Sequence, residues 1–137
     1  MSLAVLDASG ALSWCFADEA SAETDQLLDQ VRDDGALVPG LWFLELGNVL
    51  LHAERRGRIT ASDVSVRLEL ISALPILVDQ NTVGRAWTAV LDIARADRLA
   101  VYDATYLELA LRREVPLFTR DKPLAGAARK RGVAAAP

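Results

Sequence analysis

The sequence predicts an α/β fold in which a central parallel sheet of about five short strands carries helices on both faces. Two observations predict this fold class. Short apolar runs alternate with longer segments whose apolar residues recur about every 3.6 positions, as in strands separated by crossover helices. The short runs are continuously apolar rather than alternating, which is typical of parallel strands buried on both faces.

The first part of the chain supplies two of the expected strands. Leu3–Asp7 is an apolar run that ends in an acid, and Ala36–Val38 is a second run that the following proline stops. Between them, Ala8–Phe16 is expected to be irregular or a brief helical turn. Ala20–Arg32 is an acidic segment with apolar residues at helical spacing, and we predict an amphipathic helix there.

The rest of the chain continues the alternation. Leu41–Arg56 has a strong helical period and ends before a glycine, and the next helix is expected to begin at a capping residue, Thr60 or Ser62, and to end near Leu74. The remaining expected elements are the strands Ile76–Val78 and Pro116–Thr119, helices from Asn81 or Thr82 to about Ala96, over Leu99–Arg113 and over Leu124–Arg131, and an edge strand at Val133–Ala134. No linker or repeat interrupts this order, and 137 residues suffice for one core but hardly for two. We therefore expect residues 1–137 to form a single domain.

The helix predicted over Leu99–Arg113 is rich in apolar residues. Its apolar residues fall on two faces, so we expect it to be packed on two flanks rather than to lie on the surface. The two faces consist of Ala104, Leu107 and Leu111, and of Tyr102, Tyr106 and Leu109. Glu108 and Arg112 lie four positions apart on the same predicted helix. We expect them to form a routine surface ion pair.

Composition restricts the class of protein. The chain is 52% hydrophobic and 25% charged, as in globular proteins, and no apolar run approaches the ~18 residues that span a bilayer. The single cysteine, Cys15, has no internal disulfide partner, so we expect a cytoplasmic protein. The net charge of −4 does not support nucleic-acid binding through a generally basic surface. Residues 51–137 nevertheless hold fourteen bases against ten acids, which is compatible with a local basic rim.

Four isolated acids are expected to meet at one edge of the sheet. Asp7 ends the first predicted strand and Asp121 follows the fourth by two residues, whereas Glu45 and Asp103 lie near the starts of two helices. Because crossover connections place all strand carboxyl ends along one edge, where ligands bind in open α/β sheets, these four side chains can converge there. Each also has a local interpretation, because Asp7, Asp103 and Asp121 could cap a turn or helix and Glu45 could simply be exposed.

The energetics favour a bound cation over four separate local roles. Two like charges ~4 Å apart repel by about 4 kcal/mol at an effective dielectric constant of ~20, whereas a helix cap contributes about 1 kcal/mol. Converging carboxylates must therefore be partly protonated or hold a divalent ion. Oxygen ligands favour Mg²⁺ or Mn²⁺, and the single histidine, His52, leaves a zinc site poorly supplied. Such a site suits phosphodiester hydrolysis by metal-activated water.

Four segments together resemble the PIN-domain ribonucleases, specifically the VapC-type toxins of toxin–antitoxin pairs. They are Val5-Leu-Asp7-Ala-Ser9, Glu45-Leu-Gly-Asn48, the run from Val101 to Ala110, and Phe118-Thr-Arg-Asp121, and they follow the family's order and spacing over essentially the whole chain. The resemblance implies a PIN-like three-layer α/β/α fold and a Mg²⁺-dependent endoribonuclease, with Mn²⁺ as a substitute. It also implies an RNA substrate, a homodimer and a VapB-type antitoxin, through which alone operator DNA would be contacted.

The resemblance also assigns roles by position. Asp7 and Asp103 would be the principal metal ligands, and Glu45 and Asp121 would complete the catalytic acidic site directly or through water. Supporting polar groups would be Ser9, Asn48 and Thr119. Arg120 and Lys122 flank Asp121 and could hold substrate phosphates, with solvated charges as the equal alternative.

Two other classes of function compete with a nuclease. The first is a catalytically degenerate PIN-like module that binds RNA or a protein without cutting, against which the intact acidic set speaks. The second is a phosphoacceptor receiver or an aspartyl-phosphate phosphatase. A receiver would need paired acids just after the first strand, and the phosphatase would need an acid two residues beyond Asp7, where this chain has Ser9.

Overall fold

The computed structural model describes residues 3–136, and its centre is a five-stranded sheet in which all strands run parallel. In space the strands follow the order β3-β2-β1-β4-β5. They are β1 (Val5–Leu6), β2 (Ala36–Val38), β3 (Ile76–Val78), β4 (Leu117–Phe118) and β5 (Ala135–Ala136). The predicted α/β class with a parallel sheet is confirmed.

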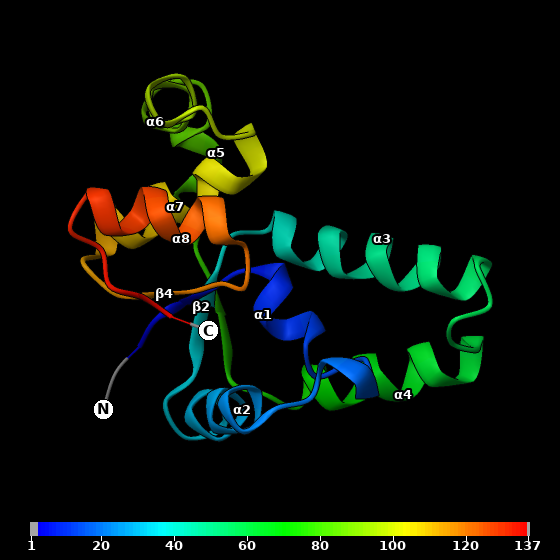
Figure 1. Cartoon of the computed structure of the whole chain (residues 1–137). Coiled ribbons are helices and arrows are strands. Elements are labelled where there is room, and N and C mark those ends of the chain that lie inside the picture. Colours follow the sequence, from blue (N-terminus) through cyan, green and yellow to red (C-terminus); the bar gives the residue numbers. More distant parts are fainter. Residues whose placement is uncertain (1–2, 137) are drawn as a thin grey trace.

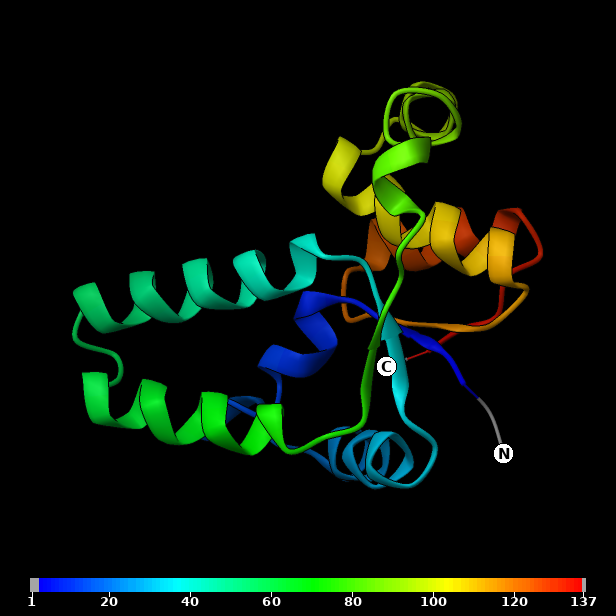
Figure 2. The same ribbon diagram turned by 180° about the vertical axis from the view of Figure 1, so that it is seen from behind.

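Helices surround the sheet in layers (Figure 1). They are α1 (Ala8–Leu12), the short 3₁₀ helix η1 (Ala17–Glu19), α2 (Ala22–Asp34), α3 (Leu41–Arg55), α4 (Ala61–Ser72), α5 (Thr82–Arg85), α6 (Ala89–Asp97), α7 (Val101–Arg113) and α8 (Lys122–Lys130). Helices α7 and α8 cover one face and α2 the other, whereas α3 and α4 project together beyond the sheet, with α1 between them (Figures 1 and 2). Within residues 3–136, no helix is long and apolar enough to cross a membrane.

The central position of β1 creates a branch point at the carboxyl end of the sheet. Val5 of β1 is in register with Leu37 on one side and with Leu117 on the other. The chain continues from β1 to β2 and β3 in one direction, whereas β4 and β5 extend the sheet in the other. The loops after β1 and β4 therefore diverge from neighbouring strand ends, the position at which open α/β sheets bind ligands.

Helix α7 is packed on several sides, as its sequence predicts. All seven residues from Ala104 to Ala110 are buried, and the helix contacts β1, β4, α6 and α8. Tyr102 differs from the prediction, because its side chain is 64% exposed although its spacing placed it with Tyr106 on an apolar face. The first turn of α7 is left uncovered by its neighbours, and this turn also carries Asp103.

Two predicted elements were placed incorrectly. The helix expected from Asn81 or Thr82 to Ala96 is divided into α5 and α6, because the backbone at Thr88 leaves the helical region (φ −115°, ψ −96°). The segment includes Gly84 and β-branched threonines, which favour helices weakly, so apolar periodicity alone overestimated its continuity. The edge strand lies at Ala135–Ala136 rather than at Val133–Ala134, because the Val133 N–H closes the end of α8 by donating to the Ala128 carbonyl.

The interpretation of Glu108 and Arg112 as a surface pair is wrong. The Glu108 side chain is 3% exposed and that of Arg112 is 17% exposed. Arg112 donates to Glu108 and also binds both carboxylate oxygens of Asp79, at 3.1 and 2.9 Å, while Arg85 donates to Glu108 at 2.6 Å. The spacing of Glu108 and Arg112 along α7 identifies them as a pair. It does not show that other segments of the protein bury them. This buried ion network connects α7 to the loop after β3 and to α5.

Arg112→Ala should destabilise the protein strongly, because it removes the guanidinium that pairs with buried Asp79 and Glu108. Breaking a buried ion pair from one side costs about 3–5 kcal/mol in free energy of unfolding, measurable by urea denaturation at pH 7. Arg112 lowers the pKa of Asp79 to about 2. Since this folded pKa lies below the unfolded value, the stabilisation is complete above pH 4 and is lost as the pH falls toward 2.

The control for this prediction is Arg95→Ala. Arg95 pairs with Asp92 on the surface of α6, where the two side chains are 74% and 78% exposed. Exposed pairs contribute less than about 1 kcal/mol. Equal losses for the two variants would contradict the stabilising role of the buried network.

Candidate active site

Asp7 lies at the branch point of the sheet, directly after β1. It is 4% exposed, and both carboxylate oxygens are occupied. Its Oδ1 accepts from the Ser9 hydroxyl at 2.7 Å and from the Gly10 N–H at 2.9 Å, and its Oδ2 accepts from the Thr119 hydroxyl at 2.5 Å. Asp7 thus caps α1 and is at the same time held from the loop after β4. Burial raises the pKa of Asp7, these three hydrogen bonds oppose the rise, and the charge of Asp121 adds to it.

The hydroxyls of Ser9 and Thr119 connect the two loops that diverge at the branch point. Ser9 Oγ accepts from the Arg120 N–H at 2.8 Å while donating to Asp7. Thr119 Oγ1 accepts from the Asp121 N–H at 3.0 Å while donating to Asp7. Each hydroxyl therefore orients the carboxylate and fixes the backbone that precedes α8. Ser9 and Thr119 thus hold the Asp7 carboxylate from two different loops.

Gly10 was not anticipated from the sequence, although it contributes one of the three hydrogen bonds to Asp7. A Cβ at this position would lie 2.7 Å from Leu6 Cδ1, so a side chain could not be accommodated without displacing Leu6. The spacing of Asp7 and Gly10 could have indicated this contact, because an N-cap carboxylate accepts from the N–H three residues later.

Asp121 caps α8, which is the local role that the sequence also allowed for it. Its Oδ1 accepts from the Leu124 N–H at 3.0 Å. The contact does not exclude a second role, since the charge of Asp121 raises the pKa of both Asp7 and Asp103. Asp121 therefore lies within electrostatic range of the other acids while it closes the helix end.

Asp103 does not cap α7, although the sequence allowed a helix cap as its local role. The N-cap of α7 is Ala100, and Asp103 is the third residue of the helix. Its side chain is half-buried, and burial is the largest cause of its raised pKa, followed by the charges of Asp121 and Asp7. No hydrogen bond to the Asp103 carboxylate is found within residues 3–136. Its ionised form therefore lacks the donors that stabilise Asp7.

Glu45 approaches the same region from α3. Its Oε1 accepts from the Tyr106 hydroxyl at 2.5 Å, and Tyr106 itself is 1% exposed. Burial raises the pKa of Glu45, the Tyr106 hydrogen bond lowers it, and the charges of Asp103 and Asp7 raise it further. The sequence placed Tyr106 in the core without assigning it a polar partner. Its position three residues after Asp103, on the same side of α7, was the available signal.

The four acids therefore share an electrostatic environment without forming a tight cluster. The charge of Asp121 raises the pKa of Asp7 and Asp103, and the charges of Asp7 and Asp103 raise the pKa of Glu45. In the described part of the chain, however, no three Asp, Glu, His or Cys side chains converge closely enough to enclose a metal ion by themselves. The arrangement provides an acidic rim whose negative charge is only partly compensated by hydrogen bonds.

The remaining predicted site residues lie around this rim in different ways. Asn48 is exposed, and no hydrogen bond to its side chain is found among the described residues. The Arg120 guanidinium contacts Glu19 Oε1 at 3.3 Å, so it is not a wholly free charge. Lys122 is exposed at the start of α8. A groove of about 490 Å³ beside the rim is lined by Thr119, Arg120, Asp121, Lys122, Ala125 and Arg129.

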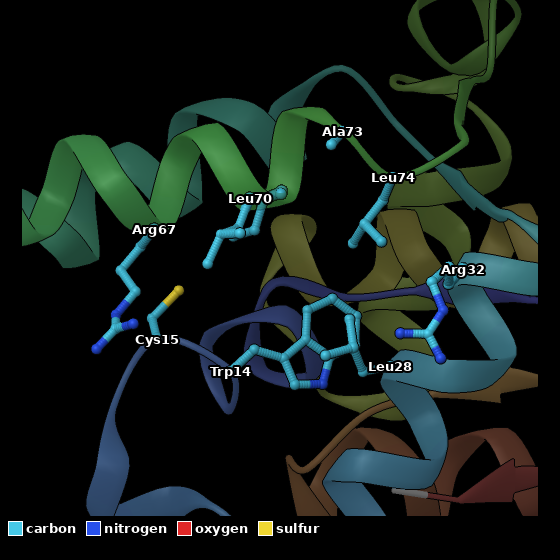
Figure 3. Close-up of a pocket in the computed structure, with 9 residues that line it drawn as sticks. Trp14, Cys15, Leu28, Arg32, Arg67, Leu70, Ala73 and Leu74 are labelled. Carbon is cyan, nitrogen blue, oxygen red and sulfur yellow. The ribbon is translucent and has the colours of Figure 1, made fainter.

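A second, more apolar cavity lies away from the acids. It has a volume of about 290 Å³ and lies between α2 and α4, where the Trp14 ring faces Leu70 and Leu74 (Figure 3). None of the four acids lines it. Cys15 does, but burial raises the pKa of its thiol to about 11, so the sulfur is protonated at neutral pH and is a poor nucleophile. The cavity is suited to apolar contact rather than to thiol chemistry.

Comparisons with known proteins agree with the observed fold. The family model described as PIN domain matches residues 4–130. The crystal structure of PAE2754 from Pyrobaculum aerophilum is 25% identical, covers 98% of this chain and 92% of its own, and has a TM-score of 0.71. FitAcB from Neisseria gonorrhoeae is 18% identical over 100% of this chain and 97% of its own, with a TM-score of 0.65, and shares the fold. No curated protein sequence matches the chain significantly.

Asp103→Asn should stabilise the metal-free protein, because it removes a half-buried charge repelled by Asp7 and Asp121. We expect the free energy of unfolding to rise by about 1 kcal/mol at pH 7, the usual gain from relieving an unfavourable charge. The folded pKa of Asp103 lies above the unfolded value of 3.8. The gain should therefore shrink as the pH falls toward 4, where the wild-type carboxyl becomes protonated.

Glu69→Gln, at an exposed position within α4, is the matched control and should change the free energy of unfolding by less than about 0.5 kcal/mol. Both variants are compared with the wild type by urea denaturation in the presence of a chelator. An Asp103→Asn variant less stable than the wild type at pH 7 would show that the acids do not repel one another.

Proposed function

The chain belongs to the PIN domain family, whose members are generally nucleases, and from this we propose that it is a cytoplasmic Mg²⁺-dependent endoribonuclease. We propose further that it is the VapC-type toxin of a type II toxin–antitoxin pair and that residues 1–137 form one nuclease domain. One observation carries the proposal. Asp7 is fixed at the branch point of the sheet by groups from both diverging loops, within electrostatic range of three further acids.

The donor set fits Mg²⁺ or Mn²⁺. The groups at the rim are carboxylates, without the cysteine or histidine ligands that zinc prefers. Burial is the largest cause of the raised pKa values of Asp7, Glu45 and Asp103, and neighbouring acids add to it, so a bound cation would favour their ionised forms. Because Mg²⁺ usually keeps several waters, carboxylates that do not enclose an ion can hold it partly through water. In this proposal Asp7 and Asp103 are the principal ligands, with Glu45 and Asp121 acting directly or through water.

The reaction proposed is hydrolysis of an RNA phosphodiester bond. When bound, the ion supplies a water of lowered pKa and polarises the phosphate. Ser9, Gly10 and Thr119 hold the Asp7 carboxylate in place before substrate arrives, which reduces reorganisation during the reaction. In this proposal Arg120 and Lys122, which line the neighbouring groove, contact RNA phosphates.

The second candidate function is a catalytically degenerate PIN-like module that binds RNA or protein. It is favoured by the lack of direct convergence of three acids within residues 3–136. The two candidates differ in one observable property, the cleavage of RNA in the presence of a divalent ion.

Two exposed apolar surfaces support the proposed partners. Val83 and Trp87, in and just after α5, are 89% and 88% exposed, and we assign them to a homodimer interface. Leu70, which is 61% exposed, borders the apolar cavity between α2 and α4. We assign that cavity as the binding site for an apolar segment of a VapB-type antitoxin. The antitoxin would in turn contact operator DNA.

Purified protein should cleave a fluorescently labelled RNA with Mg²⁺ or Mn²⁺ and stop when the ion is chelated. Asp7→Asn and Asp103→Asn should each lower the cleavage rate by about 100-fold or more, because each removes a proposed metal ligand. Glu69→Gln should cleave at the wild-type rate. Equal cleavage by all variants would reject the assignment of the acids, and RNA binding without cleavage by the wild type would favour the degenerate module.

The two partner surfaces can be tested as each other's control. Trp87→Glu should convert the homodimer to a monomer in sedimentation velocity experiments, because it places a charge in an apolar interface. Leu70→Glu should leave the homodimer intact but abolish co-purification with the proposed VapB-type antitoxin. Loss of both partners in both variants would indicate misfolding, and loss of neither would contradict both assignments.

A further inference from the structure

Arg67 of α4 lies where two cavities meet. It lines the apolar cavity between α2 and α4, and it also lines a smaller cavity of about 220 Å³. Trp14 and Leu28 are common to both linings as well, so the two cavities adjoin. We call the combined depression the α2–α4 groove. Its walls come from α2, α4 and the segment between α1 and α2, and Arg67 is the α4 residue that borders both halves.

The Arg67 guanidinium has no acidic partner. Its Nε is buried without a hydrogen bond, and no ion pair of this side chain is found within residues 3–136. Asp63, one turn earlier on α4, is engaged elsewhere, because its Oδ2 accepts from the Thr60 N–H at 3.0 Å. A buried donor that lacks an acceptor is costly to the protein. An occupant of the groove that brings an acceptor to Arg67 would therefore be stabilised by it.

The charges that line the groove favour an anionic acceptor. The two charged residues that line the apolar cavity are Arg32 and Arg67, and the one acid that lines either half among the described residues is Asp25, in the smaller cavity. Arg32 is already paired with Asp29 at the surface, whereas Arg67 is not paired. Figure 3 shows the two guanidinium groups on opposite sides of the Trp14 ring. The groove thus suits an occupant with an apolar body and a carboxylate that reaches Arg67.

We propose that Arg67 determines which protein segment binds in the α2–α4 groove, by requiring an aspartate or glutamate beside the apolar residues of that segment. The inference rests on the proposed antitoxin site and adds the residue type that this site selects. Apolar contact with Trp14 and Leu70 is tolerant of sequence, whereas a guanidinium binds a carboxylate through two parallel hydrogen bonds of fixed geometry. A segment without the acid would leave the buried donor unpaired, which discriminates against it.

The test uses a display library of random 15-residue peptides, because the partner itself is not needed. Peptides are selected on the wild-type chain, and those that also bind Leu70→Glu are discarded because they bind outside the groove. The remaining peptides should carry apolar residues together with an aspartate or glutamate at a fixed spacing from them. Peptides selected on Arg67→Gln should keep the apolar residues and lose the acid.

Affinities then show whether the acid contacts Arg67. A selected peptide and its variant with the amide in place of the acid are titrated against wild type and Arg67→Gln by fluorescence anisotropy. Either change alone should weaken binding about 10-fold, and both together should weaken it no further, because they break the same contact. Arg55→Gln, which removes an equal charge from the exposed end of α3, should bind the peptide as the wild type does.

The outcomes separate this inference from the proposals on which it rests. Groove-binding peptides without a preferred acid, or losses that add up in the double change, would overturn the role of Arg67 and leave the antitoxin cavity standing. If Arg67→Gln fails to fold, Arg67→Lys and the amide peptide replace it, and equal affinity of wild type for the acid and amide peptides would overturn the inference. Absence of any groove-dependent peptide would overturn both the inference and the antitoxin assignment, without bearing on RNA cleavage.

Discussion

The site depends on the hydrogen bonds that hold one buried carboxylate, Asp7, where two loops separate. Asp7 sits at the end of the central strand, and desolvation together with neighbouring acids disfavours its charge. Three hydrogen bonds oppose that tendency, and the residues that supply them also fix the starts of α1 and α8. The same residues therefore stabilise both the local fold around the branch point and the carboxylate of Asp7. Replacing any of these donors would affect both.

Physical reasoning from the sequence predicted the elements better than their arrangement. Alternating apolar runs and helical periods suffice for a parallel α/β class, but strands of two or three residues contain too little pattern to specify their order in the sheet. The burial of the Glu108–Arg112 pair arises from tertiary contacts, in which Arg85 of α5 donates to Glu108 and Arg112 donates to Asp79. Spacing within one helix cannot reveal such contacts, which is why a buried ion network was mistaken for a surface pair.

The candidate site was predictable to a similar extent. Acids at strand and helix ends could be placed on one rim from topology alone, and the resemblance to PIN-domain ribonucleases added Ser9 and Thr119. Gly10 and Tyr106 were not anticipated, because a glycine in a turn and a tyrosine on an apolar helix face each have sufficient ordinary explanations. Their roles depend on single hydrogen bonds, which only coordinates can reveal. Asn48, which the resemblance grouped with the acids, is exposed and has no hydrogen bond to its side chain among the described residues.

The pairing of β1 with β4 has a consequence for the order of events during synthesis. The Thr119 hydroxyl and the Asp7 carboxylate are separated by 112 positions, and Asp121 follows still later. A nascent chain emerging from the ribosome therefore holds Asp7, Ser9 and Gly10 long before Thr119, the third donor to Asp7, exists. Long-range contacts of this kind also slow folding, since the intervening chain must be ordered first. The surroundings of Asp7 can be completed only after the segment that carries Thr119 has left the ribosome.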